Sequence, residues 1–144
     1  MSSIQQLPIL AASICLRRGS EVLLIKRAKE PGKGKWAFPG GKVLWGETTS
    51  QAALRELQEE AGIAAQIGPL IGLYEVIYPQ IHFAIACYFG SAPSGEVRAG
   101  SDADDACWFD VADIFSVPLA SNIAEVVVAS GKFMQDFDKV YQPR

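Results

Sequence analysis

The chain has 144 residues and a net charge of −3, with 20% charged and 49% hydrophobic residues. A chain of this length is predicted to form one globular domain, residues 1–144, which can bury about two-thirds of its unfolded surface without disulfides or a structural metal. The mildly acidic balance and the absence of a Lys/Arg-rich run argue against binding to nucleic acid.

Two further features bear on the cellular compartment. The cysteines Cys15, Cys87 and Cys107 lie singly in apolar segments, as buried small residues do, and their odd number argues against a disulfide scaffold. Residues 1–13 have no basic region of the signal-peptide kind, and no apolar run approaches the roughly 20 residues that span a bilayer. We therefore expect a cytoplasmic protein without a membrane partner.

The N-terminal part of the chain predicts a hairpin followed by a loop. Apolar, partly β-branched residues 7–16 and 22–25 flank the polar turn 17–20. Residues 31–34, Pro-Gly-Lys-Gly, favour a loop, and residues 36–38 form a short apolar stretch. Residues 42–44 are interpreted as a further short strand.

The clearest helix begins after Thr48. Thr48 and Gln51 have the spacing of a capping box, and Gly62 is the residue type that most often follows a helix end. The residues between them are mostly good helix formers. The sequence therefore predicts a helix from Thr48 to Gly62.

The remainder of the chain predicts mostly strands and a final helix. Residues 63–89 are rich in β-branched and aromatic residues, with breaks expected at 68–69 and 79–80, which predicts two or three strands. A loop over 91–105, a short strand over 107–109, a helical turn over 111–115 and a helix over 121–137 follow. Strands on both sides of one helix, with a second helix at the end, predict an α/β sandwich with a central mixed β-sheet.

The predicted helix has an acidic face. At about 100° per residue, Glu59 and Glu60 fall within roughly 60° on either side of Glu56, whereas Leu54, Leu57 and Ala61 cover a separate apolar arc. Carboxylates three and four residues apart repel one another, and near a helix C-terminus they oppose its dipole. A bound divalent cation would compensate this charge, and oxygen ligands suit Mg²⁺ or Mn²⁺. The alternative is a solvated acidic surface.

The residues around this acidic face favour a cation site over a solvated acidic surface. Gly41, Glu47, the run Arg55-Glu56-Leu57, the pair Glu59-Glu60 and the pair Gly62-Ile63 occur in the order and spacing of the Nudix box. The chain therefore resembles the Nudix hydrolases, in particular short bacterial members of the ADP-ribose pyrophosphatase and MutT types. The resemblance implies a Nudix-like α/β/α sandwich and an enzyme rather than a sensor, because every glutamate of the box is present.

The resemblance also implies roles for single residues. Glu56, Glu59, Glu60 and the carbonyl of Gly40 would bind Mg²⁺ or Mn²⁺, and Glu47 would pair with Arg55. A general base would come from Asp102, Asp104 or Asp105, of which Asp105 aligns best, or from Glu56.

Two more residues match positions that contact the substrate in such enzymes. Arg27 would bind its phosphates with a bidentate guanidinium. Trp45, where relatives carry a smaller or polar residue, is interpreted as a contact with substrate or with the second subunit of a homodimer.

The substrate class follows less directly. Pro79 lies sixteen residues beyond Ile63, a spacing associated with ADP-ribose pyrophosphatases. We therefore expect hydrolysis of a diphosphate bond in a nucleoside diphosphate derivative, foremost ADP-ribose, to AMP and ribose 5-phosphate. The alternatives are a MutT-like nucleoside triphosphate pyrophosphohydrolase and a non-catalytic nucleotide sensor.

Overall fold

The computed structural model describes residues 6–100 and 102–141. Their strands and helices follow in the order β1 (Ile9–Arg18), β2 (Glu21–Arg27), β3 (Trp36–Ala37), β4 (Gly40–Lys42), α1 (Thr49–Ala61), β5 (Ala64–Tyr78), β6 (Ile81–Ser94), β7 (Ala103–Asp110), a 3-10 helix (Ile114–Ser116) and α2 (Ile123–Tyr141). Within this part of the chain, no helix is both long enough and apolar enough to cross a membrane.

The strands form a mixed seven-stranded sheet in the described part of the chain, with the order β3-β2-β1-β6-β5, while β4 pairs with β1 and β7 with β2. The central pair, β1 and β6, is parallel, with Ile9 opposite Phe83 and Leu16 opposite Gly90. The other strand pairs are antiparallel. The predicted mixed sheet is therefore confirmed.

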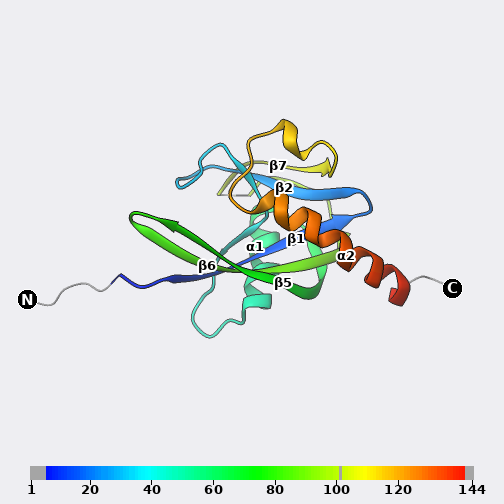
Figure 1. Ribbon diagram of the computed structural model, residues 1–144, viewed down its shortest axis with the longest axis horizontal. Helices are drawn as coiled ribbons and strands as arrows, with labels where there is room; N and C mark the ends of the chain where they lie inside the picture. Colours follow the sequence, from blue (N-terminus) through cyan, green and yellow to red (C-terminus); the bar gives the residue numbers. More distant parts are fainter. Residues whose placement is uncertain (1–5, 101, 142–144) are drawn as a thin grey trace, which may run out of the picture.

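Each face of the sheet is covered by one helix (Figure 1). Side chains alternate between the two faces of a strand. Ile14 and Leu16 of β1 accordingly pack with Leu57 of α1, whereas Cys15, between them, packs with Val126 of α2. These two clusters are the core of the α/β sandwich.

Helix α1 begins and ends where the sequence predicts. The Thr48 hydroxyl accepts a hydrogen bond from the Gln51 N–H at 3.1 Å, and the Gln51 side chain accepts one from the Thr48 N–H at 2.9 Å. Gly62 has a left-handed conformation with φ 72° and donates its N–H to the Gln58 carbonyl. Glu56, Glu59 and Glu60 therefore lie on a helix that is fixed at both ends.

Several boundaries differ from the prediction. The prediction of a break at 68–69 is wrong, because β5 continues through Gly68 and Pro69. Its pairing with β6 is irregular there, with register shifts between Ile67 and Leu70. The loop expected over 91–105 is shorter, since β6 continues to Ser94 and β7 already begins at Ala103. The strand expected over 42–44 lies at Gly40–Lys42, and α2 starts at Ile123, two residues later than expected.

Candidate functional site

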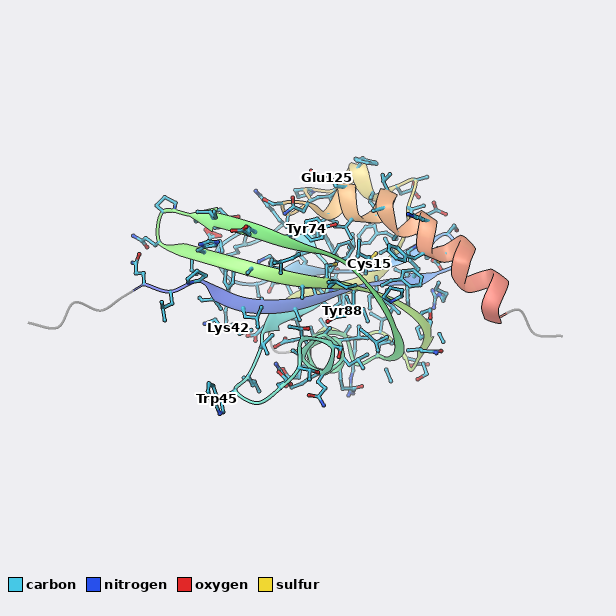
Figure 2. The ribbon with its side chains drawn as sticks, turned by 60° about the horizontal axis from the view of Figure 1, so that its bottom comes forward. Cys15, Lys42, Trp45, Tyr74, Tyr88 and Glu125 are labelled. Atoms are coloured by element: carbon cyan, nitrogen blue, oxygen red, sulfur yellow. The ribbon has the colours of Figure 1, made fainter. Side chains whose placement is uncertain are left out.

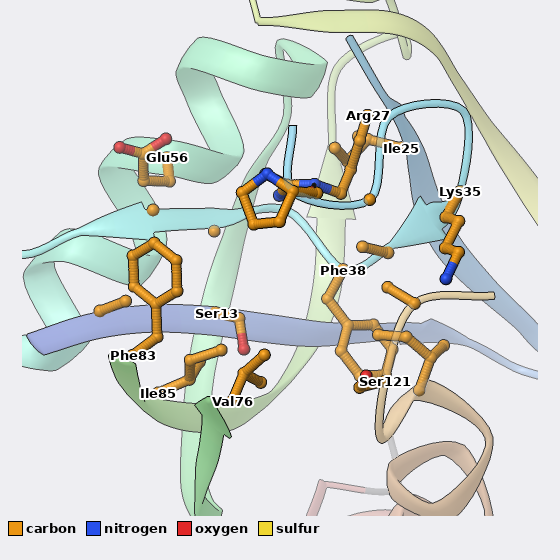
Figure 3. A pocket seen from close by; sticks show the side chains of 18 of the residues that line it. Ser13, Ile25, Arg27, Lys35, Phe38, Glu56, Val76, Phe83, Ile85 and Ser121 are labelled. Atoms are coloured by element: carbon orange, nitrogen blue, oxygen red, sulfur yellow. Dashed lines mark hydrogen bonds between the residues drawn. The ribbon is translucent and has the colours of Figure 1, made fainter. Parts of the chain in front are cut away.

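A cavity of about 560 Å³ lies between the sheet, the loop after β2 and the first residues of α2. One side, here called the charged wall, consists of Glu56 and Glu60 from α1, Arg27 from β2 and Lys35 before β3. The opposite side, the apolar wall, consists of Tyr74 and Val76 from β5 and Phe83 and Ile85 from β6. Figure 3 shows Glu56, Arg27 and Lys35 across the cavity from Val76, Phe83 and Ile85.

Glu60 is the buried acid of the charged wall. Only 7% of its surface is exposed, and its Oε2 accepts a hydrogen bond from the Gly40 N–H at 3.0 Å. Burial raises the pKa of Glu60 to about 8; the Gly40 N–H opposes this rise, and the negative charge of Glu56 adds to it. A carboxylate held in this environment needs a nearby positive charge to be ionised at neutral pH.

Arg55 organises the acidic side chains around it. Its Nε and Nη2 donate to the two carboxylate oxygens of Glu47 at 2.8 and 3.0 Å, and Nη1 donates to Glu56 at 2.9 Å and to Glu59 at 3.1 Å. Nη2 also donates to the Lys42 carbonyl at 3.0 Å. The hydrogen bonds from Arg55 lower the pKa of Glu47, and those to Glu47 raise the pKa of Arg55. The predicted Glu47–Arg55 pair is formed and joins the loop before α1 to the helix.

Two glycines let β4 pass between β1 and α1. A Cβ on Gly40 would lie 2.5 Å from the Ala12 carbonyl oxygen, and a Cβ on Gly41 would lie 2.6 Å from the Glu56 carboxylate. Gly40 therefore has no room for a side chain, and a side chain at Gly41 would displace the Glu56 carboxylate. The absence of side chains brings the β4 backbone within hydrogen-bond distance of Glu60.

The donor set fits a hard divalent cation. In residues 6–100 and 102–141 no three His, Cys, Asp or Glu side chains already converge on one point. Glu56 and Glu60 nevertheless both line the cavity, while Glu59 is exposed and held by Arg55. Burial and, to a smaller extent, the charge of Glu56 raise the pKa of Glu60, and a cation bound by these carboxylates would favour their ionised form. Oxygen ligands of this kind suit Mg²⁺ or Mn²⁺.

The loop after β2 fixes the Arg27 side chain of the charged wall. Arg27 donates its Nε to the Pro31 carbonyl at 2.7 Å, and its backbone bonds both to Lys35 and to Gly34. These bonds hold the Arg27 side chain along the loop, beside the cavity that it lines. Arg27 thus lies where the sequence places a phosphate-binding group.

The acidic residues before and within β7 are separated by the structure. Asp102 lines the cavity and forms an ion pair with Lys29 at 2.9 Å. Asp105 lies opposite Lys26 in the sheet, is exposed, and accepts a hydrogen bond from the N–H of the next residue, Ala106. It is not part of the cavity lining.

Trp45 also lies away from the cavity. Its side chain is fully exposed, and it projects from the loop between β4 and α1 (Figure 2). Trp45 is not among the residues that line the cavity.

The apolar wall was not found from the sequence. Its side chains stand in directly opposed pairs, Val76 with Phe83 and Tyr74 with Ile85. The signal is the alternation of large residues within each strand, because every second side chain points to the same face. That alternation identifies a face of the sheet, but it does not show that the face is open to a ligand.

Comparisons with known proteins agree with this geometry. The family model described as the NUDIX domain matches residues 7–137. An ADP-ribose pyrophosphatase of Methanocaldococcus jannaschii is 36% identical over 106 residues, which are 72% of this chain and 63% of that protein. The match therefore spans less than two-thirds of that relative's length.

Solved structures share the fold. The crystal structure of a MutT NUDIX hydrolase from Burkholderia pseudomallei is similar with a TM-score of 0.79 and 30% identity, over 86% of this chain and 98% of that one. The NUDIX domain of Shewanella oneidensis NrtR, solved with ADP ribose, has a TM-score of 0.78 at 20% identity, with 90% of each chain covered. The second likeness concerns the fold alone.

Proposed function

The chain belongs to the Nudix hydrolase family and is an enzyme of that family, and from this premise we propose that it hydrolyses ADP-ribose or a related nucleotide sugar to AMP and a sugar phosphate. The observation that carries the proposal is the cavity with two unlike walls. A nucleotide sugar combines a charged diphosphate with a flat, less polar base, and such a ligand matches a cavity that is charged on one side and apolar on the other.

The charged wall supplies the chemistry. Glu56, Glu59, Glu60 and the Gly40 carbonyl would hold Mg²⁺ or Mn²⁺, which would neutralise charge on the diphosphate and lower the pKa of the attacking water. Arg27 would bind the phosphates through its guanidinium, and Lys35 adds a second cation on the same wall.

The attacking water must give its proton to a base at the cavity, and a carboxylate can accept it. We assign this general-base role to Asp102 in preference to Asp105, because Asp102 lines the cavity whereas Asp105 faces solvent from β7. Glu56 is the alternative base within the same cavity. The variants Asp102→Asn and Asp105→Asn distinguish the two aspartates as general base, because only Asp102→Asn should lower kcat.

One observation supports ADP-ribose as the first candidate substrate. The relative from M. jannaschii, which is 36% identical over 106 residues, is named an ADP-ribose pyrophosphatase. The second candidate is a nucleoside triphosphate, the substrate class implied by the resemblance of the sequence to MutT-type members. A pure sensor is disfavoured because Glu56, Glu59 and Glu60 are all retained.

The test is product analysis over a substrate panel with Mg²⁺ and, separately, Mn²⁺. The panel contains ADP-ribose, other nucleotide sugars, dinucleoside polyphosphates and nucleoside triphosphates, and the assay resolves monophosphates from pyrophosphate. AMP and ribose 5-phosphate from ADP-ribose support the proposal, whereas monophosphate and pyrophosphate from a triphosphate support the alternative. No turnover with either metal would contradict catalysis and favour the sensor.

A pair of variants tests the assigned site. Glu60→Gln should lower kcat on the order of a thousandfold and leave the thermal unfolding transition in place, since the amide keeps the size of the side chain but not its charge. Glu96→Gln, at an exposed position away from the cavity, is the matched control. Equal turnover of the two variants would remove Glu60 from the metal site.

A further inference from the structure

The carboxyl end of α1 is held by a second segment of backbone. The last carbonyls of a helix have no partner within the helix. Here the Gly100 N–H donates to the Glu60 carbonyl at 2.8 Å and the Arg98 N–H donates to the Ala61 carbonyl at 3.0 Å. Both donors belong to the segment between β6 and β7. The helix turn that carries Glu59 and Glu60 is therefore tied to a loop that is distant in sequence.

The approach of this loop leaves no room for a side chain at residue 100. A Cβ on Gly100 would overlap the carbonyl oxygen of Glu59, which is backbone and cannot rotate away. The Arg98 side chain lies over Gly62, 3.0 Å from where a Cβ on Gly62 would be. The contact between loop and helix is thus a direct packing of backbone on backbone at Gly100.

Gly100 also fixes the place of Asp102. Its carbonyl accepts a hydrogen bond from the Ala103 N–H at 3.3 Å, which closes a turn that contains Asp102. Ala103 is the first residue of β7 and lies opposite Arg27 in the sheet. Asp102, which lines the cavity, is thereby held between Gly100, which is bonded to the end of α1, and Ala103, which is paired in the sheet.

From these contacts we propose that Gly100 is a positioning residue: it holds Glu59 and Glu60 on one side of the site in fixed register with Asp102 on the other. The proposal rests on the proposed function, because it gives these acids their roles. A side chain at residue 100 must push the loop away from α1, and the acids then separate although none of them has been changed.

The test compares Gly100→Ala with Gly131→Ala. The control adds the same methyl group in α2, where a Cβ would meet nothing within 4 Å. Mn²⁺ binding is measured by calorimetry without substrate, kcat and KM are measured on the best substrate of the panel, and thermal unfolding verifies that each variant is folded. Gly100→Ala should bind Mn²⁺ about tenfold more weakly than the control, as expected when the support of a metal ligand is lost. Its kcat should fall at least as much, while KM stays within about threefold because the apolar wall is untouched.

A folded Gly100→Ala protein with Mn²⁺ affinity and kcat within about twofold of the control would overturn the proposal. So would a rise in KM without loss of kcat or of Mn²⁺ affinity. Should Gly100→Ala fail to fold, Arg98→Ala decides, because it removes the packing over Gly62 and keeps the contact at Gly100. Mn²⁺ affinity and kcat within about twofold of the control would support Gly100 as the residue that holds the acids in register, and a loss of about tenfold in both would overturn the proposal. The calorimetry needs no substrate, so an inactive wild type with the Mn²⁺ difference expected for Gly100→Ala would contradict the proposed function alone.

Discussion

Replacing Arg55 by lysine keeps the positive charge but removes the planar fork of donors. In the structure this fork bonds to both carboxylate oxygens of Glu47, to Glu56, to Glu59 and to the Lys42 carbonyl. An ammonium group is a single point, and it cannot face Glu47 and Lys42 on one side and Glu56 and Glu59 on the other. We expect Arg55→Lys to lose three of these bonds.

The size of the effect follows from the exposure of the site. Each hydrogen bond contributes about 0.5–1.5 kcal/mol to the free energy of unfolding, and the low end applies because the Arg55 side chain is 24% exposed and its ion pairs are partly screened. Three lost bonds at the low end therefore cost about 1.5 kcal/mol. For a domain of this length, about 1 kcal/mol corresponds to roughly 2–4 °C in Tm, so Tm should fall by about 3–6 °C.

The assay is thermal unfolding at neutral pH without divalent metal, with Arg18→Lys as control. Arg18 forms an exposed pair with Glu21 at 2.9 Å and lies over the Trp108 ring, contacts that an ammonium group also makes. The control should change Tm by no more than about 2 °C, since exposed pairs contribute little. A Tm of Arg55→Lys equal to that of the control would refute the reasoning that the fork, rather than the charge, joins the loop to α1.

Three other predictions concern residues elsewhere in the chain. The pKa of Glu47 is lowered by its hydrogen bonds from Arg55. The contribution of Glu47 to stability is therefore present above the ordinary pKa of glutamate and is lost as pH falls through the lowered value. The Tm difference between wild type and Glu47→Gln should accordingly shrink when unfolding is followed from pH 6 to pH 3. Cys15 and Cys87 are buried, and burial raises their pKa values to about 12 and about 11. Mass spectrometry should therefore find both thiols unmodified by iodoacetamide at pH 8 until the protein is unfolded. Rapid labelling of the native protein would contradict their burial. Trp45 is fully exposed, so Trp45→Ala should leave Tm unchanged within about 2 °C while raising KM or shifting a homodimer towards monomer in light scattering; no change in either would reject both interpretations of Trp45.

Local signals in the sequence predicted the helix that carries the acids. Thr48, Gln51 and Gly62 act through bonds to residues three or four positions away, so neither cap depends on the rest of the fold. The class of the sheet was also predicted, because alternating strands and helices leave few arrangements. These features needed no knowledge of distant contacts.

Long-range register was not accessible in this way. Gly68 and Pro69 favour a chain break when taken alone, yet pairing with β6 carries β5 through them. The same problem affected the acids near β7: a register shift between Lys26 and Arg27 sets where that strand begins, and hence that Asp102, not Asp105, lines the cavity. Gly100 carried no local signal, because its reason for being glycine is a helix far away in the sequence.

The parallel pairing of β1 with β6 has a consequence for how the chain acquires its structure during synthesis. β1 leaves the ribosome well before its long partner, residues 81–94, so strands β2 to β5 and helix α1 must be made before the centre of the sheet can close. Until then β1 has only short pairings with β2 and β4, and its apolar side chains remain accessible to other molecules. Contacts so distant in sequence slow folding and lengthen exposure to aggregation. The strand that contributes side chains to both halves of the core thus stays without its long partner until β6 has been made.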